Sequence, residues 1–193
     1  MLAAVRNSIF LPYNNALQKR PLLTKSLTGM FLAGSGDLLA QRFELAQSGG
    51  GPKKNSITSG RDPWRRFFVF AAFGFVWTGP FNHVWLGYLA RKYPVNGGQT
   101  VFLKKMFVHH FLWNPIVYFP FFFSFNGLLL GLNRKEFQEW VRRDYVSNLL
   151  WCYIVWGPTT AVIFQRVPEH LQSVFMSGIS LGWNSFLSWK SNR

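Results

Sequence analysis

Two long uncharged runs near the C-terminus constrain the fold of this chain most. Tyr145–Gln165 and His170–Trp189 carry no formally charged residue, and only Arg166-Val167-Pro168-Glu169 separates them. A helix rises about 1.5 Å per residue, so each run is long enough to cross a hydrocarbon layer of about 30 Å. Neither run alternates between apolar and polar residues as a half-buried strand does. The region therefore predicts a packed transmembrane hairpin.

Three further segments upstream predict membrane spans. Leu22 to about Glu44 is the weakest in hydropathy, Phe67–Ala90 is uncharged, and Met106–Asn133 is rich in Phe. Gly79-Pro80 should kink the second of these, because proline removes a helical hydrogen bond. The charged stretch 134–144 either lies at the membrane surface or extends the following span.

These segments predict an all-α fold, a polytopic transmembrane helix bundle with four to five spans in a single membrane domain, 1–193. Ser48–Gly60 (residues 48–60) predicts a flexible loop. Residues 1–20 predict an N-terminal interfacial helix or targeting segment, because positions 1–36 contain basic but no acidic residues, as mitochondrial import signals do. The distribution of Lys and Arg between the two sides does not decide the orientation.

The net charge of +14 allows either a nucleic-acid partner or a membrane surface as the target of the basic residues. The long charge-free runs favour the membrane, and no nucleic-acid motif is present. We therefore expect the basic loops to contact anionic lipid headgroups and expect no direct nucleic-acid binding. We also expect protein partners in a larger complex, or a homo-oligomer.

Asp37 is a carboxylate inside a predicted span, where an unpaired charge costs about 2.5–3.5 kcal/mol at the centre on insertion scales. A topology of five alternating spans places it at the same membrane face as Arg65 and Arg66. We predict a buried pair of Asp37 with one of these arginines. A structural role that fixes helix register is favoured over a proton- or ion-handling role.

Four polar side chains, His83, His109, His110 and Asn114, fall in the opposite leaflet in the same topology. Three imidazoles there could bind a metal ion or relay protons. Adjacent histidines point in different directions on a helix, however, and no carboxylate or cysteine accompanies them. Hydrogen-bonded or headgroup-level histidines are the favoured interpretation.

The last predicted helix carries a polar stripe: Ser173, Ser177, Ser180, Asn184 and Ser188. This stripe either lines an aqueous path or permits close packing. Small residues spaced four apart allow helices to approach closely, and we predict packing roles for Gly29, Ala33, Gly36, Gly178 and Gly182. Trp183, Trp189 and Lys190 are typical of anchors at the membrane interface.

Motifs of common enzymes are missing: the sequence has no nucleophile elbow, P-loop, H-E-x-x-H or dinucleotide fingerprint. The single cysteine, Cys152, lies in an apolar run and excludes an intramolecular disulfide. We expect a non-enzyme without cofactor or metal.

Several blocks, taken in order, resemble the Mpv-seventeen / peroxisomal-membrane-protein-twenty-two family of small integral organelle membrane proteins. The blocks are Pro21, Thr28, Gly36-Asp37 and Gln41; Asp62 and Arg65; Gly79-Pro80, His83 and Trp85; Trp156, Phe164 and Val167-Pro168; and the ending 183–190 (WNSFLSWK). The resemblance implies at least four spans and a location in the mitochondrial inner membrane, with the peroxisomal membrane as the alternative. It also implies a non-selective pore, or a role in organelle homeostasis, mitochondrial DNA maintenance or mitoribosome assembly.

Departures from the family pattern bear on function. His109-His110 stand where the family commonly has Asp-Gln, and Thr160, Ile163 and Gln172 replace Gln, Asn and Arg. These changes remove polar groups that could line a conduit. The first hypothesis is a protein that forms or modulates a small-solute pore. The alternatives are a structural accessory subunit of a larger inner-membrane complex, such as a respiratory assembly, and a membrane tether for the mitoribosome.

Overall fold

The computed structural model describes residues 11–47 and 62–191, and the regular structure of this part is entirely helical. The predicted loop 48–60 and the first ten residues of the predicted segment 1–20 lie outside the described residues. The elements are α2 (Leu11–Lys19), α3 (Pro21–Gln47), α4 (Pro63–Val76), η2 (Trp77–Phe81), α5 (Asn82–Lys92), η3 (Val95–Gly97), α6 (Gly98–Phe107), η4 (Val108–Tyr118), α7 (Phe119–Leu129), α8 (Arg134–Arg166) and α9 (Glu169–Ser191). The all-α prediction is confirmed.

Several of these elements continue into one another without a break. α4, η2 and α5 form one rod over 63–92, and α6, η4 and α7 form another over 98–129. Pro80 lies inside η2 and Pro115 inside η4, and both segments are π-helical. Because proline has no N–H to donate, a local widening lets the helix continue past it. The distortion expected at Gly79-Pro80 thus takes the form of a π-helical turn.

The start of α8 is defined by a reciprocal cap. The side chain of Asn133 accepts a hydrogen bond from the Glu136 backbone N–H, and the Glu136 carboxylate accepts one from the Asn133 N–H, both at 2.9 Å. This capping box satisfies two backbone donors at the helix start. The charged stretch 134–144 therefore extends the following apolar run as one helix.

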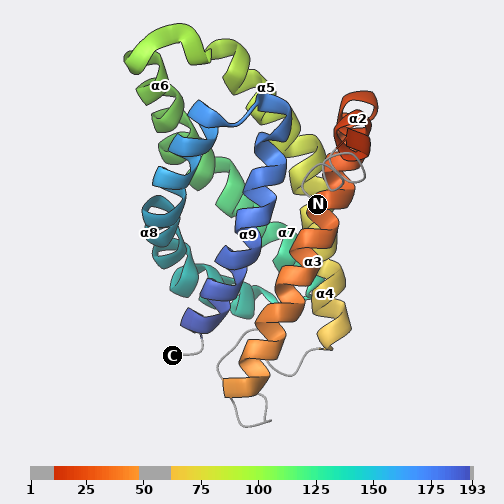
Figure 1. Ribbon diagram of the computed structural model, residues 1–193. Helices are drawn as coiled ribbons and strands as arrows, with labels where there is room; N and C mark the ends of the chain where they lie inside the picture. Colours follow the sequence, from red (N-terminus) through yellow and green to blue (C-terminus); the bar gives the residue numbers. More distant parts are fainter. Residues whose placement is uncertain (1–10, 48–61, 192–193) are drawn as a thin grey trace.

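Val167-Pro168 joins the C-terminal helices α8 and α9 (Figure 1). These two helices share only a small contact area. α9 packs far more extensively against α3, which also packs along α4. Gly178 and Gly182 lie exposed, and a Cβ added to either would meet no atom within 4 Å. These glycines therefore do not pack against another described helix of the chain, contrary to a tight hairpin. Their contact with a partner helix stays a prediction.

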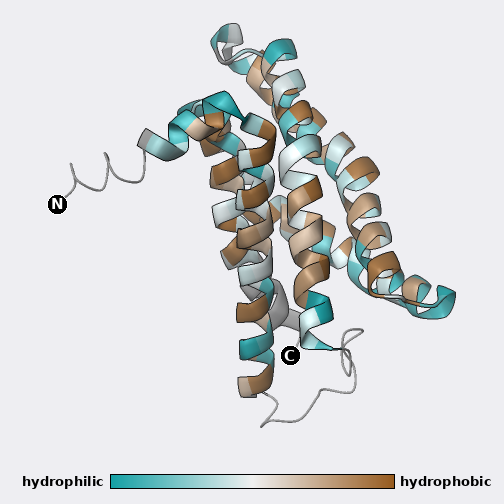
Figure 2. Ribbon diagram, turned by 90° about the vertical axis from the view of Figure 1, so that its right-hand side faces the viewer, coloured by the Kyte–Doolittle hydropathy of each residue, from teal (hydrophilic) through white to brown (hydrophobic). Residues whose placement is uncertain are grey.

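Within residues 11–47 and 62–191, two stretches are long and apolar enough to cross a membrane, 63–92 and 134–166. The count of four to five spans and the interfacial placement of α2 stay predictions. Large apolar side chains are exposed on many helices, including Phe31 at 71% and Leu128 at 80%. Figure 2 shows apolar residues along the long helices and hydrophilic ones toward their ends. Such a surface suits a lipid environment.

Candidate functional site

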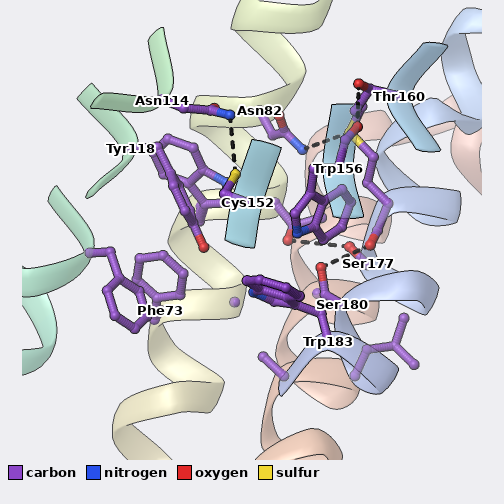
Figure 3. Close-up of a pocket in the computed structure, with 18 of the residues that line it drawn as sticks. Phe73, Asn82, Asn114, Tyr118, Cys152, Trp156, Thr160, Ser177, Ser180 and Trp183 are labelled. Carbon is purple, nitrogen blue, oxygen red and sulfur yellow. Dashed lines mark hydrogen bonds between the residues drawn. The ribbon is translucent and has the colours of Figure 1, made fainter. Parts of the chain in front are cut away.

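A cavity of about 120 Å³ lies inside the bundle, between helices far apart in the sequence. Its polar wall consists of uncharged side chains, and Figure 3 shows several of them gathered around it. The hydroxyl and amide groups come from η2, α5, η4, α8 and α9: Thr78, Asn82, Asn114, Thr160, Ser177 and Ser180. Aromatic rings form much of the remaining wall: Phe70, Phe73, Trp77, Trp113, Tyr118, Phe122, Trp156 and Trp183.

The cavity is smaller than the roughly 300–1,000 Å³ of pockets that hold drug-sized ligands. Thr78 and Ser177 bring their hydroxyl oxygens to 3.5 Å of each other across it, and Ser180 donates to the Met176 carbonyl at 2.8 Å. A polar cavity of this size can accommodate a few water molecules. Two members of the predicted polar stripe, Ser177 and Ser180, thus line the cavity. The side chains of Ser173, Asn184 and Ser188 lie outside the described part of the structure.

His109 is buried beside the cavity and accepts a hydrogen bond. The indole Nε1 of Trp85 lies 2.9 Å from His109 Nδ1. Because an indole N–H can only donate, Nδ1 must be the unprotonated nitrogen. His109 is therefore neutral, with its proton on Nε2.

His110 takes the same tautomer for a different reason. Thr160 Oγ1 lies 2.6 Å from the Trp156 carbonyl oxygen, so its single proton is donated there. The hydroxyl then accepts from His110 Nε2 at 2.6 Å. That leaves His110 Nδ1 to accept from the Asn114 amide at 3.4 Å. Thr160, which stands where the family commonly has Gln, thus supplies a polar group to the cavity wall.

His83 does not join the hydrogen bonds of His109 and His110, because it is hydrogen-bonded to Lys25. Its Nδ1 lies 3.0 Å from the ammonium Nζ of Lys25, which is only 3% exposed. The described residues contain no group of three or more His, Cys, Asp or Glu that could hold a metal ion. The three histidines therefore make three different hydrogen bonds and do not converge on one site.

Asp37 is paired with Arg66, and Arg65 points elsewhere. Arg66 Nε donates to Asp37 Oδ1 at 2.6 Å, and its two terminal nitrogens donate to the two oxygens of Glu44 at 2.7 and 2.9 Å. Gln41 donates to the other Asp37 oxygen at 2.6 Å. Arg65 instead donates to the Leu129 carbonyl at the end of α7, at 3.0 Å from Nη2.

The close crossing of α3 and α4 depends on small residues. A Cβ added to Gly29 would lie 2.5 Å from the Gly74 carbonyl oxygen, and one added to Gly74 would lie 2.6 Å from the Ala33 Cβ. Gly36 is buried on the same helix. Gly29 and Ala33 therefore stand at a helix contact.

Of the three predicted interface anchors, the structure describes the side chain of Trp183. Trp183 lines the central cavity and contacts Trp156 edge-on, with ring centroids 6.5 Å apart. Trp189 and Lys190 belong to α9, but their side chains lie outside the described part.

Sequence reasoning missed two buried lysines, Lys25 and Lys105, each 3% exposed. Lys25 lies near the start of the first predicted span, and Lys105 directly precedes the predicted span Met106–Asn133, so neither position indicated burial. It also missed Thr78, which lies within the π-helical turn, and Asn82, which directly follows it; both line the cavity. A polar residue next to an intraspan proline is the one signal that could have indicated this.

Comparison with known proteins finds a matching family model and similar proteins. Residues 127–188 match the model of the Mpv17 / PMP22 family. "Protein SYM1" of Gibberella zeae is 29% identical over 94% of this chain and 96% of its own length. "Mitochondrial inner membrane protein Mpv17" of Danio rerio is 29% identical over the same shares, and "PXMP2/4 family protein 4" of Dictyostelium discoideum is 28% identical over 91% and 89%. No solved structure matches the chain.

These relatives cover nearly the whole chain, whereas the family model covers its C-terminal third. None of the three names describes an enzyme. The names of the Mpv17 relatives in Danio rerio and Xenopus laevis confirm the expected location in the mitochondrial inner membrane. The resemblance that the ordered sequence blocks indicated is thus confirmed: the chain is similar to the Mpv17 / PMP22 family model over residues 127–188 and to proteins named Mpv17 and SYM1 over most of its length.

Proposed function

We propose that this chain is a non-enzymatic protein of the mitochondrial inner membrane that forms or modulates a pore for small solutes. The central cavity carries the proposal. Its polar lining consists of hydroxyl, amide and neutral imidazole groups, which can exchange hydrogen bonds with water without holding an ion tightly.

The same wall restricts what could pass. Its side chains leave about 120 Å³, and its aromatic rings come from several helices. A conducting state needs these rings to separate, because only water-sized species fit the described arrangement. We therefore expect a mostly closed pore that excludes metabolites until the bundle widens.

Liposome flux tests this proposal. Purified protein is reconstituted into vesicles, and the release of a small neutral solute is measured. Ser180→Leu places a larger side chain in the cavity and should abolish the flux. Gly182→Leu adds the same side chain on the exposed face of α9, where an added Cβ meets nothing within 4 Å, outside the residues that line the cavity, and should leave the flux unchanged. Equal flux from wild type and Ser180→Leu would contradict the proposal.

A structural accessory subunit of a larger inner-membrane complex is the second candidate. The observation that favours it is the open, exposed face of α9 at Gly178 and Gly182, since small residues four apart admit a partner helix. Tight vesicles, together with stoichiometric co-purification of a partner on a native gel, would support this candidate. Loss of the partner on Gly178→Leu would identify the surface.

A further inference from the structure

A second cavity, of about 360 Å³, lies at the end of the bundle where α5 ends and α6 begins. Tyr93, Phe102 and Phe164 provide aromatic walls, and Leu103 and Pro94 add apolar surface. Lys105 is the one charged residue among the lining residues. The cavity is separate from the proposed pore, because the two share none of their lining residues.

Lys105 is buried and forms no direct ion pair with any described residue. Its residue is 3% exposed, and its ammonium lies over the Phe164 ring, 4.5 Å from the centroid. Among the described residues no hydrogen bond or ion pair involves the Lys105 ammonium. Glu169, the one acidic residue at this end, attracts the charge of Lys105 but does not form an ion pair with it. A ring face alone is a poor substitute for water around an ammonium. The arrangement therefore favours an anion within the cavity.

The helix start beside the cavity provides a second attraction for negative charge. α6 begins at Gly98, and neither Gly97 nor any other side chain caps its first backbone N–H groups. Gly98 and Gln99, its first two residues, both line the cavity. The free N–H groups and the dipole at a helix N-terminus bind phosphate and carboxylate.

The end of the bundle that carries this cavity has a strong excess of positive charge. Exposed basic residues surround the cavity: Arg91, Lys92, Lys104 and Arg166. All acidic residues of the chain except Glu169 lie toward the opposite end, on the second half of α3, before α4 and on the first turns of α8. An anionic membrane surface would therefore be attracted to the end that carries the cavity.

We propose that this second cavity binds the phosphate group of an anionic phospholipid, with Lys105 and the start of α6 holding the phosphate. The aromatic and apolar walls contact the glycerol and the first acyl carbons. The cavity is larger than a bare phosphate requires, and its walls are largely apolar, so the lipid is favoured over free phosphate. The exposed basic residues disfavour a zwitterionic headgroup, whose cationic part they repel.

Lipid titration of delipidated protein in detergent tests the proposal, with the melting temperature as the readout. Phosphatidylglycerol should stabilise the wild type at lower concentration than phosphatidylcholine. Lys105→Met should weaken the phosphatidylglycerol response about tenfold or more, as expected for a lost charge-assisted hydrogen bond. Lys104→Met removes an exposed charge from the neighbouring position and should stay within about twofold of wild type.

The variants, inorganic phosphate and crosslinking each give an outcome that could overturn the proposal. An unchanged response in Lys105→Met, or an equal loss in Lys104→Met, overturns the proposal. A Lys105-dependent response to inorganic phosphate that equals the lipid response keeps the phosphate site but overturns the lipid as its source. Should Lys105→Met fail to fold, photo-crosslinking of wild type with a photoactivatable phosphatidylglycerol decides: adducts within 93–105 or at Phe164 support the site, and adducts only elsewhere overturn it.

Discussion

Arg66 Nε lies 2.6 Å from Asp37 Oδ1 and joins the start of α4 to the middle of α3. The side chain of Asp37 is 2% exposed and that of Arg66 12%. The same guanidinium binds both oxygens of Glu44, so one cation serves two carboxylates. Loss of the arginine would leave both acids without their shared partner, whereas loss of Asp37 would leave Arg66 paired with Glu44.

Arg66→Met should therefore destabilise the protein more than Asp37→Asn. Removing one partner of a buried ion pair costs about 3–5 kcal/mol. The measurement is the free energy of unfolding in mixed micelles. The double variant Arg66→Met/Asp37→Asn should recover part of the loss, because one unpaired carboxylate is removed.

The matched control is Arg143→Met, which breaks the more exposed pair of Arg143 with Asp144. Exposed pairs contribute about 0–1 kcal/mol. An Arg66→Met variant no less stable than Arg143→Met would show that the buried triad does not hold α3 to α4.

Much of the helical fold followed from the sequence. Long charge-free runs need backbone hydrogen bonds satisfied within the segment, and this requirement predicted helices at 67–90 and 145–165. The ion pair of Asp37 with Arg65 or Arg66 was predicted from the topology, because a carboxylate in a span needs a nearby cation. The choice of Arg66 depends on side-chain direction at the first turns of α4, which spacing alone does not give.

Long-range packing and burial could not be predicted in this way. The contact of α9 with α3 joins segments more than a hundred residues apart, and no local pattern encodes it. Gly178 and Gly182 share the spacing of Gly29 and Ala33, yet only the latter face a neighbouring helix in the described structure. Lys105 has an exposed neighbour, Lys104, and only their positions around α6 distinguish the buried one.

Gly29→Ala tests the crossing of α3 and α4. The added methyl group would collide with Thr78 and the Gly74 carbonyl, so the helices must separate. Overpacking of this kind costs typically about 1–3 kcal/mol, despite alanine's better helix propensity. Gly182→Ala is the control, since its added Cβ meets nothing within 4 Å and should leave stability equal or higher. Thermal unfolding in detergent distinguishes them, and equal melting temperatures would contradict the close crossing.

Asn133→Ala should loosen the first turn of α8. The substitution removes the acceptor for the Glu136 N–H, and loss of such a cap costs about 0.5–2 kcal/mol. Amide hydrogen exchange at residues 134–137 should accelerate. Asn133→Ser retains a capping oxygen and should preserve slow exchange, so acceleration by serine and alanine alike would argue against the cap.

His109 and His110 should both be neutral at pH 7 with the proton on Nε2. The donor-only indole of Trp85 fixes the first tautomer, and the Thr160 hydroxyl, whose proton is committed to the Trp156 carbonyl, fixes the second. Nitrogen-15 chemical shifts of the imidazole rings report the protonated nitrogen directly.

Trp85→Phe removes the donor and leaves His109 Nδ1 without its partner, which costs about 1–3 kcal/mol of folding free energy for a buried group. Trp64→Phe is the control, because Trp64 is 62% exposed. A proton on Nδ1 of either ring would contradict this hydrogen-bond network. It would also reopen the proton-relay interpretation of the histidines, because the donors that now occupy both Nδ1 atoms would then have to point elsewhere.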